Sequence, residues 1–236
     1  MPIHIKADKS AVADRALISG DPGRIRLLSS LLEETKLVNE NRGFLVYTGI
    51  YKGKKVTMAS HGIGGPSIAI VIEELSSLGI SHFVRYGTAG SLVPEVNVGE
   101  FVIATGAYHN SGGLFSQYLK EDIGLSTSPD IELTYEIMGQ FKNSNIPVIK
   151  GDVFSSDAFY AEDESFAKRW AERGVVAVEM ELATLFMLGK LRKVRTAGVL
   201  IISDNLVKGG EWIAREELEE RAIAGAKVVL EALIKV

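Results

Sequence analysis

The sequence predicts an α/β fold: one domain over residues 1–236, built on a central mixed, mostly parallel twisted sheet flanked by helices. Short apolar runs rich in Val and Ile alternate along the chain with amphipathic stretches of helical period. These runs are apolar throughout, which is typical of strands buried on both faces of a parallel or mixed sheet. Because no Pro- or Ser-rich linker and no internal repeat divides the 236 residues, we expect a single domain.

Local chemistry supports the individual elements. Residues 52–54 have turn chemistry between two β-prone runs, which predicts a hairpin of strands 47–51 and 56–60. A Pro at its start and a Gly just past its end delimit a helix over 66–78. The other predicted elements are strands over 16–19, 82–86, 101–104, 148–154, 175–178 and 197–202, helices over 24–32, 131–141, 180–190 and 216–234, and a Gly- and Ser-rich surface loop over 110–129.

Composition excludes several classes of function. The chain has no cysteine, which excludes a disulfide framework, a Cys-ligated zinc site and a thiol nucleophile. Its formal net charge of -4 gives no electrostatic reason to bind nucleic acid or an acidic membrane face. No apolar signal-peptide core or membrane-length apolar run is present, so we expect a cytoplasmic protein. None of the four histidines has metal-ligand spacing to another, so no metal site is expected.

The segment Gly20-Asp21-Pro22-Gly23-Arg24 follows the first predicted strand. Gly20 lets a backbone approach a ligand closely, while Asp21 and Pro22 suit the cap and first position of a helix. Free amides at a helix N-terminus, with Arg24 in the first turn, predict an anion site. The alternative is an ordinary strand-to-helix turn with a surface arginine.

A second candidate, Arg85-Tyr86-Gly87-Thr88-Ala89-Gly90, closes the predicted strand 82–86. An arginine at the end of a buried strand is costly unless it meets an anion. Glycines on both sides of Thr88 offer backbone amides beside the guanidinium and the Thr88 hydroxyl. Either a phosphate site or a structural ion pair with an internal carboxylate explains Arg85.

Acidic residues form two further candidates. The carboxylates of Glu179 and Glu181, on either side of Met180, are able to accept hydrogen bonds from ribose hydroxyls, or to complement a helix dipole. Ser203-Asp204 follows the most apolar strand. Apolar surroundings would raise the pKa of Asp204 and make it a general acid, whereas a cap or loop-fixing role is the alternative.

Taken together, these segments resemble the hexameric type of nucleoside phosphorylases over nearly the whole chain. The matching segments, in order, are Gly20-Asp-Pro-Gly-Arg24, Asn41-Arg42-Gly43, Tyr47-Thr48-Gly49, His61-Gly-Ile-Gly64, Arg85-x-Gly-Thr88-x-Gly90, Ser155-Ser-Asp-Ala-Phe-Tyr160, Glu179-Met-Glu181 and Ser203-Asp204. Within that family the chain looks most similar to the archaeal branch that acts on 5′-methylthioadenosine and on ordinary purine nucleosides. The resemblance implies a homo-oligomer, a hexamer built as a trimer of dimers, with sites shared between subunits.

The resemblance also implies a role for each residue. Phosphate would be held by Gly20, Arg24, Arg85 and Thr88, with Arg42 from a neighbouring subunit; ribose by Met180, Glu181 and the neighbour's His4; and the base by Phe159, Glu179, Ser203 and Asp204. Asp204 would protonate the leaving purine while phosphate attacks the sugar. Phosphate would be a co-substrate, and no metal or organic cofactor would be needed.

Differences from related enzymes favour one substrate class and one reaction type. Uridine-cleaving relatives carry a Gln and an Arg after the aromatic pair, where this chain has Glu162 and other acidic residues, so purines are favoured. Hydrolytic nucleosidase relatives lack the anion-binding arginines, so Arg24 and Arg85 favour phosphorolysis; uridine phosphorylase and methylthioadenosine nucleosidase remain the alternatives. An arginine that assists the acid in purine enzymes stays unassigned between Arg215 and Arg221.

Overall fold

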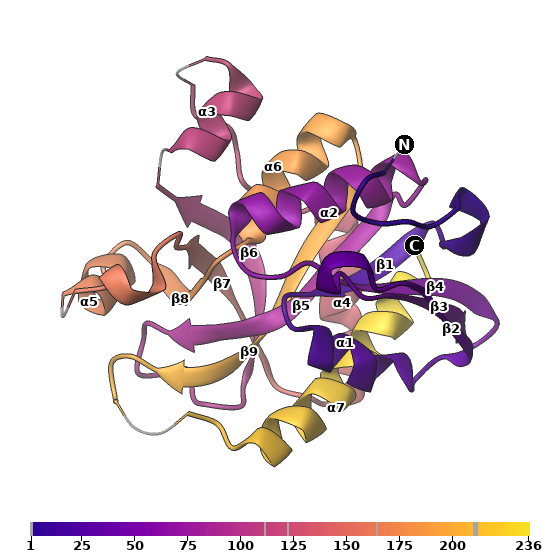
Figure 1. Cartoon of the computed structure of the whole chain (residues 1–236). Coiled ribbons are helices and arrows are strands. Elements are labelled where there is room, and N and C mark those ends of the chain that lie inside the picture. The colour runs from indigo at the N-terminus through magenta and orange to yellow at the C-terminus, as the bar shows by residue number, and fades with distance from the viewer. Residues whose placement is uncertain (1, 111, 122, 164, 210–211) are drawn as a thin grey trace.

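One mixed sheet runs through the protein and carries helices on both faces (Figure 1). The computed structural model describes residues 2–110, 112–121, 123–163, 165–209 and 212–236. Within these residues the sheet has nine strands in the order β2-β3-β4-β1-β5-β8-β7-β6-β9. The strands are β1 (Arg15–Ser19), β2 (Glu33–Asn39), β3 (Val46–Tyr51), β4 (Lys54–Ser60), β5 (His82–Ser91), β6 (Phe101–His109), β7 (Val148–Ser155), β8 (Val175–Glu179) and β9 (Arg195–Asn205).

The pairing pattern confirms the predicted mixed sheet. Strand β1 lies parallel to β4 and β5, β5 parallel to β9, and β7 parallel to β6 and β8, whereas the other pairings are antiparallel. Because β5 pairs with both β8 and β9, strands β5, β8, β7, β6 and β9 close into a ring. The parallel strands β1, β5 and β9 therefore end at the same edge of the sheet.

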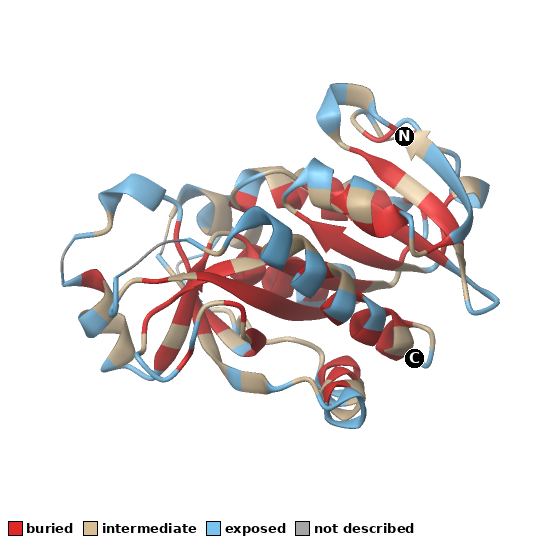
Figure 2. Ribbon diagram, turned by 90° about the horizontal axis from the view of Figure 1, so that it is seen from below, coloured by how far each residue is buried: buried red, intermediate tan, exposed pale blue. Residues whose placement is uncertain are grey.

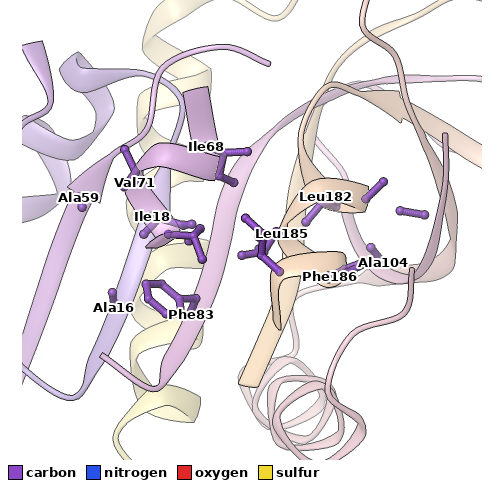
Figure 3. Packing of buried hydrophobic residues seen from close by; sticks show 14 of the residues in the cluster. Ala16, Ile18, Ala59, Ile68, Val71, Phe83, Ala104, Leu182, Leu185 and Phe186 are labelled. Carbon is purple, nitrogen blue, oxygen red and sulfur yellow. The ribbon is translucent and has the colours of Figure 1, made fainter. Parts of the chain in front are cut away.

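Helices cover the two faces in separate groups (Figure 1). Helices α2 (Gly65–Ser77) and α6 (Leu182–Arg192) pack on one face, where Ile68, Leu185 and Phe83 belong to one buried cluster (Figure 3). The other face is covered by α1 (Pro22–Ser29), α4 (Ile131–Ser144) and α7 (Arg215–Leu233). The central strands are consequently buried on both sides, as their continuous apolar runs predict (Figure 2).

Three elements were not predicted. Strand β2 is charged and exposed over most of its length, as edge strands often are, so it lacks the apolar pattern used to find strands. Helix α3 (Gly113–Leu119) lies inside the predicted loop 110–129, and the short helix α5 (Phe166–Ala171) precedes β8. Three short 3-10 helices complete the described elements: η1 (Lys9–Ala11), η2 (Asn41–Gly43) and η3 (Phe159–Ala161).

Strands β5 and β9 extend beyond their predicted ends, which corrects the position of two candidate segments. Arg85 and Thr88 lie inside β5, and Asp204 lies inside β9. Gly87 and Gly90 lie within β5, where they make room for side chains. A Cβ on Gly87 would overlap the Arg85 guanidinium, and a Cβ on Gly90 would lie 2.5 Å from Leu206. In the part of the chain described, no helix is both long and apolar enough to cross a membrane.

Candidate active site

A cavity of about 770 Å³ opens at the edge of the sheet where β1, β5 and β9 end. The strand register assembles it, because Gly90 of β5 pairs with Val178 of β8 on one side and with Asp204 of β9 on the other. Segments distant in sequence thus meet at one place. The lining residues are Gly20, Asp21, Pro22, Arg24, Gly62, Ile63, Arg85, Gly87, Thr88, Ala89, Gly90, Phe159, Glu162, Val178, Glu179, Met180, Glu181, Ser203, Asp204, Leu206 and Trp212.

The loop after β1 has the predicted conformation. Asp21 caps α1 by accepting a hydrogen bond from the Gly23 amide at 2.7 Å, and Pro22 opens the helix. A Cβ on Gly20 would lie 2.9 Å from the carbonyl oxygen of Gly62, so the two loops approach too closely for a larger residue. Arg24 projects from the first turn, and burial lowers its pKa. Its Nη1 donates a long 3.4 Å hydrogen bond to Ser19 Oγ.

Arg85 is almost wholly buried and forms the ion pair that the sequence left as an alternative. Its Nη2 pairs with Glu181 Oε2, and its Nη1 lies 3.4 Å from Glu179 Oε2. Burial opposes the charge, but the two carboxylates outweigh it and raise the pKa of Arg85. Its Nε and Nη1 still have no hydrogen-bond partner among the described residues. The guanidinium therefore retains buried donors at the cavity, which an anion would satisfy.

The Glu179 carboxylate lies at the start of α6, as the helix-dipole alternative predicted. It accepts hydrogen bonds from the amides of Glu181 at 2.8 Å and Leu182 at 2.9 Å, and from Ser155 Oγ. Burial raises the pKa of Glu179. Since both carboxylate oxygens are engaged in this way, Glu179 orders the start of α6 and offers little to a base.

Glu181 faces the cavity from the N-cap position of α6. Its Oε1 accepts a hydrogen bond from the Gly64 amide at 2.7 Å, while Oε2 pairs with Arg85. Although burial opposes ionisation, the Arg85 charge holds the pKa of Glu181 below its usual value. An ionised carboxylate with remaining lone pairs is suited to accept from hydroxyl groups.

Asp204 lines the cavity together with Ser203, Glu162 and two aromatic residues. Burial raises its pKa, and Ser203 Oγ donates to its Oδ1 at 2.8 Å, which partly opposes the rise. Glu162 also lines the cavity, where burial and the charge of Asp204 raise its pKa. The rings of Phe159 and Trp212, whose centroids are 6.4 Å apart, border the same space. The sequence singled out Glu162 only as a departure from uridine-cleaving relatives, without a role in the site.

Two predicted site residues lie away from this cavity. His4 Nδ1 pairs with Glu74 at 2.7 Å, and its ring meets Phe44 edge-on. Arg42 is exposed in η2, with a positive φ of 56°. Neither lines the cavity of its own chain, and the resemblance assigns both to the cavity of a neighbouring subunit.

The two candidate helper arginines belong to α7. Arg215 is largely exposed and pairs with Glu219, whereas Arg221 pairs with Glu217, four residues before it. Neither lines the cavity, so neither is assigned a part in it. In the described ranges, no group of three or more His, Asp or Glu side chains is arranged to hold a metal ion.

The family to which this chain belongs follows from its similarity to known protein families. The model of the Phosphorylase superfamily matches residues 14–235, which is nearly the whole chain. The chain belongs to this superfamily. It is 34% identical over 221 residues to a guanosine phosphorylase of Halorubrum lacusprofundi, covering 93% of this chain and 90% of the relative. The resemblance to nucleoside phosphorylases is thereby confirmed.

Further relatives support the same assignment. A DeoD-type purine nucleoside phosphorylase of Exiguobacterium sibiricum is 37% identical over 239 residues, covering 100% of both chains. Among solved structures, a uridine phosphorylase from Vibrio fischeri matches with a TM-score of 0.88 and 29% identity, covering 100% of this chain and 98% of that one. The predicted superfamily fold is therefore confirmed as well.

Proposed function

We propose that this phosphorylase cleaves purine nucleosides with inorganic phosphate, giving the free base and a ribose 1-phosphate. The observation that carries the proposal is one cavity lined by both Arg85, which has unpaired donors, and Asp204, whose pKa is raised by burial. Gly90 of β5 is the register partner of Asp204 and lies five residues after Arg85. Five residues of an extended strand span about 16 Å. The anion site and the acid therefore occupy separate parts of the cavity.

The proposed reaction assigns one role to each part. Gly20, Arg24, Arg85 and Thr88 bind phosphate, and one of its oxygens attacks the anomeric carbon as the bond to the purine nitrogen breaks. Asp204 donates its proton to the imidazole-side nitrogen of the leaving purine. The bound phosphate stabilises the positive charge that develops on the ribose.

The sugar and base contacts complete the proposal. Glu181 accepts hydrogen bonds from the ribose hydroxyls and Met180 packs under the sugar. Phe159 stacks near the base and Ser203 holds Asp204. The relatives named as purine and guanosine phosphorylases favour a purine base over uracil. The proposal includes several purine nucleosides, which differ in their base and in whether a 5′-methylthio group replaces the 5′-hydroxyl, and experiment must rank them.

The deciding experiment measures base release from 5′-methylthioadenosine, inosine, guanosine and uridine, each with and without phosphate, and identifies the sugar product. We expect phosphate-dependent release from the purine nucleosides with a sugar 1-phosphate as product. Release without phosphate would identify a nucleosidase and leave Arg24 and Arg85 unexplained. Uridine as the sole substrate would overturn the role of Asp204.

We also propose that the enzyme is a hexamer in which His4 and Arg42 complete the cavity of a neighbour. The test mixes two inactive variants, Arg42→Ala and Arg85→Met, and reassembles them together. Mixed oligomers contain some cavities with both arginines, so activity should reappear in the mixture. If no activity returns although mixed oligomers form, each chain uses its own Arg42 and the shared cavity is wrong.

A further inference from the structure

His61 is a fully buried histidine that the reaction outlined above does not use. It follows β4 directly, and its backbone is held on both sides. Its amide donates to the Ser19 carbonyl oxygen at 2.9 Å, and its own carbonyl oxygen accepts from Ser67 Oγ at 2.6 Å. The ring therefore sits at a defined place between the end of β1 and the start of α2.

Both ring nitrogens of His61 lack a hydrogen-bond partner among the described residues. Burial, reinforced by the nearby Arg85 charge, lowers its pKa to about 3. Glu181 and the Gly62 backbone oppose this shift, and Arg24 adds to it. The ring is therefore neutral near pH 7, with one N–H donor and one acceptor nitrogen. A buried polar side chain with neither group satisfied is unusual in a folded protein and calls for a partner.

His61 does not itself line the cavity, but its ring lies next to Gly20, which does. Its Cε1 atom, which is bonded to both ring nitrogens, lies 3.5 Å from the position that a Cβ on Gly20 would occupy. The unpaired Nε and Nη1 of Arg85 belong to the same neighbourhood, since Arg85 and Arg24 are among the charges that act on His61. Buried N–H groups of Arg85 and His61 that have no partner among the described residues thus belong to the same part of the protein. A tetrahedral oxyanion has enough acceptor oxygens to satisfy them together.

We propose that His61 is a further phosphate-binding residue, which donates a ring N–H to one oxygen of the phosphate held by Gly20, Arg24 and Arg85. This inference rests on the proposed function and extends its phosphate site. A neutral donor positions one oxygen without adding a further positive charge, so the phosphate keeps more of its nucleophilic character.

The test compares His61→Phe, which keeps a ring of similar size but removes both nitrogens, with His61→Gln and His61→Asn. The amide of Gln places an N–H near the Nε2 position and that of Asn near Nδ1, so the better of the two identifies the donating nitrogen. The control is His82→Phe, which removes a half-buried histidine at the opposite end of β5, outside the cavity. Binding of inorganic phosphate is measured by titration calorimetry, and steady-state kinetics supply KM and kcat.

We expect His61→Phe to weaken phosphate binding and raise the KM for phosphate about tenfold or more, the usual loss for one hydrogen bond to a charged group. The kcat at saturating phosphate should change less, one amide variant should recover affinity, and His82→Phe should bind phosphate normally. Unchanged phosphate affinity in a folded His61→Phe protein would overturn the inference. A wild-type protein that binds no phosphate would instead overturn the proposed function.

A direct measurement covers the case in which His61→Phe fails to fold. Long-range proton–nitrogen correlation spectra of the wild-type protein report both ring nitrogens, and His61→Gln identifies the His61 signals. Added phosphate should shift the protonated ring nitrogen of His61. Signals that stay unchanged at saturating phosphate would contradict the contact.

Discussion

Arg85 and Glu181 hold each other in a buried ion pair, with only 6% and 4% of their side chains exposed. In the proposed reaction Arg85 binds phosphate and Glu181 binds ribose. The groups meant for the two substrates therefore neutralise one another when the cavity contains neither. Their pairing also explains how a sheet interior tolerates these charges, since a buried charge is stable only with a partner and hydrogen bonds.

The ion pair predicts an asymmetric pattern of stability changes. Arg85→Met leaves the carboxylates of Glu179 and Glu181 buried without their cation, which should cost about 3–5 kcal/mol. For a chain of this size that loss lowers Tm by roughly 10 °C. The double variant Arg85→Met/Glu181→Gln should recover part of the loss, because it removes one of the stranded charges. Thermal unfolding of both variants is the measurement, and equal Tm values would contradict the coupling.

Gly87 predicts a way to disturb phosphate binding while every charge stays in place. A Cβ at this position would overlap the Arg85 guanidinium, which its two carboxylates prevent from moving far. Gly87→Ala should therefore raise the KM for phosphate, by about tenfold if one contact to the anion is lost. The control is Gly139→Ala in α4, where a Cβ has nothing within 4 Å. It should leave kinetics unchanged, and equal kinetics for both variants would argue against the assigned anion site.

The sequence predicted the Gly20 loop well because its structure depends on neighbours in the chain. Asp21, Pro22 and the helix that follows are local choices, and capping rules describe them. Arg85 was predicted at the end of its strand, and Thr88 and Asp204 were predicted to follow theirs, but all three lie within β5 or β9. Pairing between distant strands decides where a strand ends, and the glycines that were expected to offer backbone amides also make room for Arg85 and Leu206.

The partners of buried charges were harder to predict. The sequence left Arg85 between an anion and an internal carboxylate. The structure pairs it with Glu181, while two of its nitrogens have no hydrogen-bond partner among the described residues. The burial of both ring nitrogens of His61 had no sequence signal, because it depends on segments distant in the chain, including the end of β1, where Ser19 accepts from the His61 amide. His4 and Arg42 depend on neighbouring subunits, and their placement stays a prediction.

Asp204→Asn should lower turnover on purine nucleosides about 10²-fold or more, the usual contribution of a general acid, because the amide N–H is not acidic enough to transfer its proton. Steady-state rates at saturating phosphate test this, with Asp152→Asn as a control, since Asp152 bonds to Thr105 and does not line the cavity. In the wild type, kcat should fall as pH rises through the pKa of Asp204. Unchanged turnover would remove Asp204 from the reaction.

The same substitution should stabilise the folded protein at neutral pH. Burial raises the pKa of Asp204 above its ordinary value of 3.8, so the folded state binds its proton more tightly than the unfolded state does. Ionisation at higher pH therefore destabilises the wild type, and the asparagine variant avoids this cost. The gain should shrink as pH falls towards 3.8, which denaturant unfolding at pH 7 and pH 4 would measure. A less stable variant at pH 7 would contradict the direction of the pKa shift.

Glu74 predicts the opposite pH dependence. Its carboxylate accepts hydrogen bonds from the amides of Ile3, His4 and Ile5 at 3.0, 2.9 and 2.7 Å and from His4 Nδ1 at 2.7 Å. Although burial alone would raise the pKa of Glu74, these bonds lower it to about 2. The unfolded state then binds this proton more tightly than the folded state does. The carboxylate therefore stabilises the fold above about pH 4.5, and this contribution is lost as pH falls towards 2.

Glu74→Gln should accordingly destabilise the protein at pH 7 by about 1–3 kcal/mol, because an amide oxygen accepts more weakly than a carboxylate. The matched control is Glu73→Gln on the same helix, which breaks an exposed pair with Arg192 and should cost less than about 1 kcal/mol. Denaturant unfolding at pH 7 and pH 3 measures both variants, and hydrogen exchange at the Ile5 amide reports local opening of the N-terminal segment. The deficit of Glu74→Gln should narrow at pH 3. A deficit equal at both pH values would mean that the loss comes from packing and not from the charge of Glu74.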